Sequence, residues 1–495
     1  MGEVQKQSVN NSIIQYAGIV LGYFSSVFLF TEILDAEQYG LTRVLFAIAG
    51  IYVNLSSIGA FKVIIRFFPF FKSDDKRHKG FLLFNGILVL VGFVLTTLIY
   101  LLLRQPISSQ YSSATSLFFD HYNWVIWLSF LMLYTNLLEG FLMALKKTVL
   151  TYFLKNIFIR LIWILEILIF HAGLIDFDQF LFIYLSSYIL NFGVMLVYLW
   201  KLGELKWSLE FFNQRKRILK VVTNYGLFTI VSGLSAMLVN RIDIIMITFL
   251  LGLSSTSIYQ IAFYISSVIY VPSQAIYRIS MPVVAELWKQ KKMKEMELLY
   301  QKSCLNQLLS GGFVFLIIWC NIDDLFHMLK PIYSEGKWVV LLLSLSVLFN
   351  MLTGINQVII VITKYFRYDT YASIALGILT VVTNIIFIPI LGLEGAALAT
   401  MLSVVLYHTF KFFLIKVKLK MVAFTSKTIW AMLLLLFTYI VSVLLPVPFE
   451  NFVLNMIFRS LILSVIYFTT LYVTGISEDI KSVMKSYLDL MKKRK

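Results

Sequence analysis

Ionisable side chains stand inside long apolar stretches of this sequence, where each of them needs a role. A charged group at the centre of a helix in membrane hydrocarbon costs at least about 2.5 kcal/mol. Cations outnumber acids among these groups, and an interior rich in Lys and Arg suits an anionic ligand, especially phosphate or diphosphate, because Arg offers a bidentate fork and Lys a point charge. The cations are Lys62, Arg66, Lys155, Arg160, Arg241 and Arg278, and the acids are Glu139, Glu166 and Asp243.

The depth of each group helps to assign its role. Glu139 and Lys155 lie seven and eight residues from the 146–147 Lys pair, hence roughly 10–12 Å along a helix from that end at 1.5 Å per residue. These two residues bind a ligand or form a structural ion pair between adjacent helices. Lys62 and Arg278 also lie in the half of the membrane nearer the cytosol. They bind a diphosphate there, or their side chains extend toward the lipid headgroups. Both alternatives stay open at this point.

The acids and the deeper cations suggest a path across the membrane. Arg160 is near mid-depth and Arg241 is nearer the middle or the outer half, so a staggered set of cations could pass an anion outward. Asp243 stands two positions from Arg241, so the two side chains do not face each other on one helix. Asp243 is a candidate for binding a coupling proton or cation, or for pairing with a cation on another helix. Glu166 could do either.

About fourteen apolar stretches must position these side chains. The chain has 495 residues, of which 59% are hydrophobic, and its mean hydropathy is +0.84. Average soluble proteins hold about 45–50% apolar residues, and roughly 20 helical residues cross a bilayer. We therefore predict an all-α polytopic membrane protein with spans near 11–34, 41–65, 80–103, 122–145, 149–170, 179–200, 222–250, 257–281, 303–320, 337–362, 371–391, 395–416, 427–446 and 453–474.

The connections between these spans alternate in charge. Nearly all clustered Lys and Arg fall in every second connection, and the opposite connections hold mostly acids, which predicts that both termini lie in the cytosol. The net charge of +16 then faces anionic lipid headgroups and does not indicate nucleic acid. The basic connections hold Lys72, Lys76, Arg77, Lys79, Lys146, Lys147, Arg215, Lys216, Arg217, Lys220, Lys289, Lys291, Lys292, Lys294, Lys364, Arg367, Lys416, Lys418 and Lys420.

A weak internal repeat divides the chain. Residues 30–46 read FTEILDAEQYGLTRVLF and residues 247–263 read ITFLLGLSSTSIYQIAF, an offset of about 217 residues. Because each repeat holds six spans, both lobes enter the membrane from the same side, as in parallel-repeat transporters whose site lies between the lobes. We predict an N-terminal six-helix lobe over 1–220, a C-terminal six-helix lobe over 221–420, two additional spans over 421–475 and a basic cytosolic tail over 476–495.

Several classes of protein are disfavoured. The histidines are scattered without metal-ligand spacing, and no nucleotide-binding loop is present, so we expect no metal or cofactor and an energy supply from a gradient or an accessory protein. Cys304 and Cys320 lie about 24 Å apart along one span at 1.5 Å per residue, too far for a disulfide. A membrane polysaccharide polymerase or ligase would need paired catalytic acids or Arg/His clusters in a substantial loop, and no such loop occurs. The chain is therefore predicted not to be an enzyme.

Four segments carry a resemblance to a known family. They are LDAEQYG from Leu34, NRIDIIMITFLLG from Asn240, IYQIAFYIS from Ile258 and TNIIFIPILGLEGAALAT from Thr383. In order and spacing the chain resembles, over essentially its whole length, the polysaccharide-export branch of the multidrug/oligosaccharidyl-lipid/polysaccharide (MOP) exporter superfamily. The resemblance implies two six-helix lobes in a V plus two C-terminal helices, in the bacterial inner membrane. It also implies alternating access that flips an undecaprenyl-diphosphate-linked repeat unit of O-antigen, capsule or exopolysaccharide, with a polymerase and assembly proteins as partners.

The resemblance also implies roles for particular residues. Family members carry lumen cations that engage the anionic lipid carrier, and Lys62, Arg241 and Arg278 best match that role. The lipid II flippases, a sister branch, can bind sodium, and Asp243, Asn384 and Thr400 match three of the four ligands. Ile388 stands where the second acid would be, so the sodium set is incomplete. We therefore expect coupling either to sodium or to protons. Protons would bind at Asp243 or Glu139.

A cation-coupled multidrug exporter of the same superfamily is the alternative function. Such exporters usually have twelve spans and an acidic cavity suited to cationic drugs. The fourteen predicted spans and the cationic interior of this chain favour the flippase.

Overall fold

The computed structural model describes residues 3–111, 115–206, 208–209, 216–445 and 449–493. Over these residues the chain forms helices and no strand. Ten of the described helices are long and apolar enough to cross a membrane, and one of them, Phe366–Leu419, contains a break at Gly392. The all-α polytopic class is thus confirmed, whereas the count of fourteen spans stays a prediction. The helices fall into two compact units, Met1–Ser257 and Ile258–Lys495.

The first unit contains twelve α-helices together with two π-helical segments and a 3₁₀ turn among its described residues. They are α1 (Glu3–Tyr23), η1 (Phe24–Leu29), α2 (Phe30–Ile33), α3 (Ala36–Ser56), α4 (Ala60–Phe71), η2 (His78–Gly80), α5 (Phe81–Tyr111), α6 (Ser116–Asp120), α7 (Trp124–Ala144), α8 (Thr148–Phe153), η3 (Leu154–Phe158), α9 (Ile159–His171), α10 (Phe177–Ser186), α11 (Tyr188–Lys201) and α12 (Lys216–Leu251). Helix α13 (Leu253–Ser267) continues from the first unit into the second.

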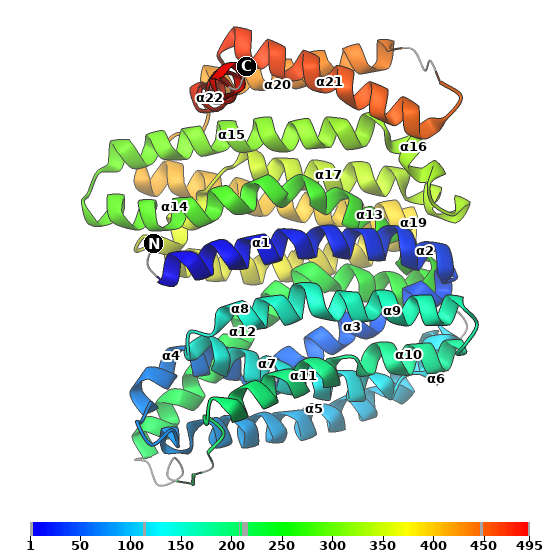
Figure 1. Ribbon diagram of the computed structural model, residues 1–495, viewed down its shortest axis with the longest axis vertical. Coiled ribbons are helices and arrows are strands. Elements are labelled where there is room, and N and C mark those ends of the chain that lie inside the picture. The colour runs from blue at the N-terminus through cyan, green and yellow to red at the C-terminus, as the bar shows by residue number, and fades with distance from the viewer. Residues whose placement is uncertain (1–2, 112–114, 207, 210–215, 446–448, 494–495) are drawn as a thin grey trace. The chain divides into compact units, whose positions relative to one another are not determined.

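Helix α7 lies at the centre of the first unit. It packs against α3, α4, α5 and α11, and α12 packs against α3 and α4 (Figure 1). Large aromatic side chains fill the space where α4, α5 and α7 meet: the Phe71 and Phe81 rings stack at 4.8 Å, and the Phe68 and Phe141 rings meet edge to face at 5.1 Å. Aromatic rings in such geometry add to the burial of their area, so α7 has a fixed position against its neighbours.

A glycine separates α3 from α4, which the sequence predicted as one span over 41–65. Gly59 precedes α4 with φ of 68°, a left-handed conformation that side chains with Cβ rarely adopt. A Cβ at this position would also meet the Thr229 hydroxyl and the Gly226 carbonyl of α12. The break therefore depends on glycine, and it turns α4 so that Lys62 lies near its start.

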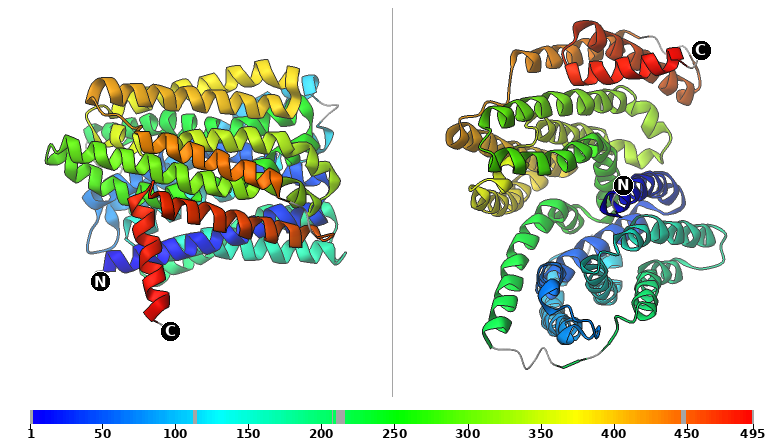
Figure 2. Two further views of the ribbon diagram at one scale, coloured as in Figure 1. Left: turned by 90° about the horizontal axis from the view of Figure 1, so that it is seen from above. Right: turned by 60° about the vertical axis from the view of Figure 1, so that its left-hand side comes forward.

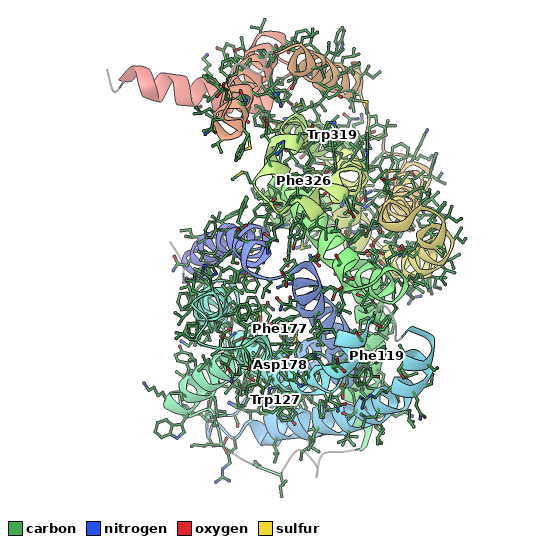
Figure 3. All side chains as sticks on the ribbon, turned by 90° about the vertical axis from the view of Figure 1, so that its right-hand side faces the viewer. Phe119, Trp127, Phe177, Asp178, Trp319 and Phe326 are labelled. Atoms are coloured by element: carbon green, nitrogen blue, oxygen red, sulfur yellow. The ribbon has the colours of Figure 1, made fainter. Side chains whose placement is uncertain are left out.

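The two ends of the first unit differ in character. At one end a His121 ring nitrogen lies 2.9 Å from the Asp178 carboxylate and joins the α6–α7 turn to α10. Figure 3 looks at this end and labels Asp178, Phe177 and Phe119. At the other end the basic connection over 72–80 meets the segment after α11, where His78 Nε2 lies 2.5 Å from Glu204 Oε2.

The second unit contains the remaining helices. They are η5 (Val268–Tyr270), α14 (Val271–Lys289), α15 (Met293–Cys320), α16 (Ile322–His327), η6 (Pro331–Gly336), α17 (Lys337–Leu352), α18 (Asn356–Ile362), α19 (Phe366–Leu419), α20 (Ser426–Leu444), α21 (Phe452–Thr474) and α22 (Glu478–Lys493). Its core joins α14, α15, α18 and the end of α19 around Tyr300, Cys304 and Ile359. Helix α15 also packs against α20 and α21 through Tyr467, whose hydroxyl donates to the Leu309 carbonyl at 2.9 Å.

Helix α19 is a hairpin of two antiparallel helices. Gly392 adopts φ of 59° and ψ of −132° in its middle. Side chains roughly equally far on either side then meet: Thr383 and Ser403 hydroxyls lie 3.2 Å apart, and Ser373 and Tyr407 hydroxyls lie 3.2 Å apart. The two halves correspond to the separate spans that the sequence predicted over 371–391 and 395–416.

The last helix leaves the bundle of the second unit. Gly475 ends α21 in the left-handed conformation, and α22 then runs across the direction of α21 (Figure 2, left). Two ion pairs hold its first turn, Lys427 to Glu478 at 2.9 Å and Lys302 to Asp479 at 3.3 Å. The hydrogen bond from Lys427 is the main cause that lowers the pKa of the Glu478 carboxyl.

Candidate functional site

A polar cavity of about 300 Å³ lies inside the first unit. Helices α3, α4, α7 and α12 form its walls, and the π-helical segment η3 contributes one side chain. Three of the predicted site residues line it: Lys62, Lys155 and Glu139. Apolar side chains form much of the remaining lining, together with neutral polar groups that include Asn54, Ser57, Asn136 and Thr229. The cavity therefore presents two cations, one acid and several hydrogen-bonding groups to anything that enters.

The Lys155 ammonium and the Glu139 carboxylate form an ion pair. The Nζ atom lies 3.2 Å from both carboxylate oxygens. The Lys155 side chain is 61% exposed, whereas that of Glu139 is 9% exposed. The pair expected as the alternative role for these residues is thus present. Because an ammonium has three donors, Lys155 can serve the buried carboxylate and an anion in the cavity together.

Arg66 lies one turn beyond Lys62 on α4 but is not among the described residues that line the cavity. Its guanidinium lies 4.4 Å from the centre of the Tyr225 ring on α12 and 5.6 Å from that of Phe67. Such cation–π contacts hold a cation at an aromatic face. The structure therefore places Arg66 at the packing of α4 against α12.

A second group of charges lies near Tyr188 at the start of α11. Arg160, Arg241 and Glu139 all lie within electrostatic reach of its hydroxyl. Arg160 also packs against α1, because a Cβ at Gly22 would meet the Arg160 guanidinium. Glu139 thus belongs both to the pair with Lys155 and to the charges near Tyr188.

The two deep acids of the first unit are both buried. Asp243 on α12 is 7% exposed and Glu166 on α9 is 5% exposed. The Glu166 Oε2 atom has no hydrogen-bond partner among the described residues. Asp243 therefore meets the burial that a coupling site needs, and so does Glu166.

The other predicted residues lie in the second unit. Arg278 is exposed on α14, Asn384 is fully buried in the first half of α19, and Thr400 is half-buried in the second half. The sodium set combines Asp243 of the first unit with these two α19 residues of the second, and it stays a prediction.

The second unit contains a buried ion pair that was not predicted from the sequence. Lys411 Nζ lies 2.8 Å from the Asp369 carboxylate, and the Lys411 side chain is completely buried. The ammonium also lies 3.9 Å from the centre of the Tyr407 ring. The sequence feature that could have revealed this pair is the position of Lys411 inside the 395–416 stretch, five residues before the basic group that begins at Lys416.

Two more cations inside apolar stretches were also missed. Arg43 donates to the Tyr184 hydroxyl at 2.9 Å and lies 4.6 Å from the centre of the Tyr39 ring. Arg459 donates to the Cys320 carbonyl at 2.6 Å and lies 3.5 Å from Asp324. Both have local partners and therefore stabilise helix packing.

No group of three or more His, Cys, Asp or Glu side chains that could hold a metal occurs within the part of the chain that the structure describes. Cys304 and Cys320 are both free, as their spacing predicted.

Comparison with known proteins identifies the family and the fold. A family model described as "Polysaccharide biosynthesis protein" matches residues 8–288, more than half of the chain. Comparison of the sequence with the curated proteins finds no match.

Solved structures share the fold at low identity. The lipid II flippase MurJ in an inward closed conformation aligns with 94% of this chain and 99% of its own, at 14% identity and a TM-score of 0.66. An inward-facing multidrug resistance MATE transporter of the MOP superfamily aligns with 82% of this chain and 98% of its own, at 16% identity and a TM-score of 0.63. A MOP superfamily transporter from Pyrococcus furiosus aligns with 85% of this chain and 96% of its own, at 16% identity and a TM-score of 0.52.

Proposed function

The chain belongs to the polysaccharide biosynthesis protein family, and from this premise we propose that it flips a lipid-linked oligosaccharide across the bacterial inner membrane. The substrate is an undecaprenyl-diphosphate-linked repeat unit of O-antigen, capsule or exopolysaccharide. The chain is a multi-pass membrane protein with the fold shared by MurJ and MATE transporters, and this fold supports the proposed function.

The observation that carries the proposal is the cavity that holds Lys62 and Lys155. Both cations lie toward the end of the unit that bears the basic connections, where a cytosolic headgroup would enter. A diphosphate needs charge-assisted donors when it leaves water. The Lys155 ammonium meets this need because its side chain is exposed in the cavity while the buried Glu139 carboxylate holds it in place.

Alternating access would carry the headgroup outward. In the inward-open state the diphosphate and sugar enter the cationic cavity while the polyprenyl tail stays in lipid. Arg160 and Arg241 then provide deeper positive charge, and Arg278 contributes from the second unit. The lobes rock and release the headgroup on the outer side. Coupling to a proton through the buried Asp243 or Glu139, or to sodium with Asn384 and Thr400, would supply the energy.

The experiment compares a strain that lacks the gene with strains that express variants of the protein. In the deletion strain we expect lipid-linked oligosaccharide to accumulate on the cytosolic leaflet and surface polysaccharide to be lost. Lys62→Ala and Arg278→Ala should fail to restore export although the protein stays in the membrane. Lys72→Ala, which removes an exposed cation just beyond the end of the helix that bears Lys62, should restore export fully.

The same strains separate the alternatives. Unchanged lipid-linked oligosaccharide together with altered drug sensitivity would replace the flippase with a multidrug exporter. Full export by the Lys62→Ala variant would remove the cationic cavity from the mechanism, and full export by Arg278→Ala would remove Arg278 from it. The mass of the accumulated lipid would name the sugar.

A further inference from the structure

An apolar groove of about 780 Å³ opens on the side of the first unit. Helices α5 and α11 both pack on α7 and leave the groove between them. Leu138 of α7 forms the buried floor, while Leu90 of α5 and Trp200 of α11 stand exposed at the rims. Because α5 and the α10–α11 segment are candidate membrane spans, the groove faces lipid chains.

The groove is long enough to hold part of a single lipid chain. Leu82 and Leu90 of α5 both line it, so it extends about 12 Å along the helix at 1.5 Å per residue. Gly86 stands between them, and a Cβ there would meet no atom within 4 Å. The absent side chain at this position keeps the groove open.

Positive charge gathers where the groove reaches the end of the spans. We call Lys76, Arg77 and Lys206 the cationic collar. Lys206 lines the groove and donates to the Asp75 carbonyl at 3.0 Å, while Lys76 donates to the Leu202 carbonyl at 2.6 Å. Neutral carbonyls thus orient these two ammonium groups.

The segments around the cationic collar also carry a net positive charge. The segments 72–80 and 201–206 hold six Lys or Arg residues against three Asp or Glu residues. Arg77 and Lys206 also contribute to lowering the pKa of the Asp75 carboxyl, after the hydrogen bond from the Ser73 hydroxyl and the bond from the Arg77 amide. Anionic headgroups are attracted to basic groups beside a span by about 1 kcal/mol per cation.

We propose that this groove binds one acyl chain of an anionic phospholipid of the leaflet beside the basic connections, with the lipid phosphate against the cationic collar. The site is separate from the polar cavity. Helix α7 presents Asn136 and Glu139 to the cavity and Tyr134 and Leu138 to the groove. A substrate whose diphosphate is held at Lys62 would have to pass its tail across α7 to enter the groove, which favours a phospholipid as the occupant.

The bound lipid would influence transport through α7. This helix carries Glu139, which holds Lys155 in the cavity, and Leu137 lines both the cavity and the groove. Filling the groove therefore supports the helix that positions the cavity charges.

Native mass spectrometry of the full-length protein in detergent tests the proposal. We expect the wild type to retain added phosphatidylglycerol in preference to phosphatidylcholine with the same chains. Gly86→Leu should weaken phosphatidylglycerol binding about tenfold, the loss expected when about two buried methylene groups are displaced. The matched control is Gly193→Leu on α11, where a Cβ also meets no atom within 4 Å but the residue does not line the groove.

A charge variant tests the collar separately. Lys206→Gln should weaken phosphatidylglycerol binding about fivefold and leave phosphatidylcholine binding unchanged. Lys201→Gln, an exposed cation at the end of α11 that does not line the groove, should bind as the wild type does. Equal retention of the two phospholipids by the wild type would overturn the proposal.

A spectroscopic measurement does not depend on the folding of Gly86→Leu. Phosphatidylglycerol with brominated chains should quench the fluorescence of the wild type more than that of Trp200→Phe, because Trp200 lines the groove. Equal quenching in both proteins, or unchanged binding in a folded Gly86→Leu variant, would overturn the proposal. Retention of a polyprenyl phosphate with no retention of phosphatidylglycerol would instead assign the groove to the substrate tail.

Discussion

At the residue scale, variants of Lys155 and Glu139 can distinguish two roles of Lys155. It either binds the anionic headgroup or only forms a structural ion pair with Glu139. If Lys155 binds the anionic headgroup, Lys155→Gln should lower export more than tenfold, because a hydrogen bond to a charged group contributes about 1.5–3 kcal/mol. If Asp243 and not Glu139 is the coupling acid, Glu139→Gln should retain export, since the cation remains in the cavity. The double variant should then be as inactive as Lys155→Gln alone, measured as flipped lipid-linked oligosaccharide in vesicles. Recovery of export in the double variant would show that the pair is only structural.

The buried pair of Lys411 and Asp369 makes a prediction about stability. Asp369→Asn leaves a fully buried ammonium without its carboxylate, which should reduce the free energy of unfolding by about 3–5 kcal/mol. Asp369→Leu combined with Lys411→Met removes both charges and should recover most of that loss. Thermal unfolding of the purified protein measures both. Lys416→Met, an exposed cation on the same helix, should change stability by less than about 0.5 kcal/mol, and an equal loss there would contradict a special role for the pair.

Residue types and spacing predicted part of the site but not its pairing. Lys62, Lys155 and Glu139 could be selected because each lies well inside an apolar stretch, and the structure brings them to one cavity. Arg66 has the same sequence signature, but its guanidinium lies over Tyr225. The sequence does not contain that distinction, because it depends on which aromatic ring of α12 lies beside α4.

At the scale of elements, the break between α3 and α4 makes the next prediction. Gly59→Ala puts a Cβ at positive φ, which costs about 1–2 kcal/mol, and against the backbone of Gly226. We expect a lower unfolding temperature and loss of export, since Lys62 follows directly on α4. Gly193→Ala has open space at a helical position and should raise stability by about 0.5–1 kcal/mol. A Gly59→Ala protein as stable as the wild type would contradict the need for glycine.

The sequence predicted most helices but not their internal irregularities. Apolar length located the spans because roughly 20 helical residues cross a bilayer whatever their neighbours are. It predicted separate spans on the two sides of Gly392, and the structure has them as a hairpin. It did not predict the break at Gly59, where the apolar run continues through a left-handed residue, nor the π-helical segments, which have no signature in hydropathy.

At the scale of the whole molecule, the charge of the connections predicts a topology that labelling can measure. In a background with Cys304 and Cys320 replaced by Ala, Asp35→Cys and Glu394→Cys should react with a membrane-impermeant maleimide in intact cells. Asp74→Cys, in a basic connection, should react only after the cytosolic face is exposed. All three positions are exposed in the structure. Labelling of Asp74→Cys from outside would invert the topology and place the Lys62 cavity toward the opposite side.

The π-helical segment η3 sets the angular phase between α8 and α9, which the sequence predicts as one span over 149–170. The Ile159 amide donates to the Leu154 carbonyl, a bond that spans five residues where an α-helix spans four. In a regular α-helix with 3.6 residues per turn, positions five apart point in divergent directions. The wider turn changes the angle between Lys155, which pairs with Glu139 of α7, and Arg160, whose guanidinium packs at Gly22 of α1. Deleting one residue between Leu154 and Phe158 would restore even winding and turn the rest of α9, with Glu166, by about 100°. The π-helical segment therefore acts as an angular offset between Lys155, which lines the cavity, and the charges that follow it on α9.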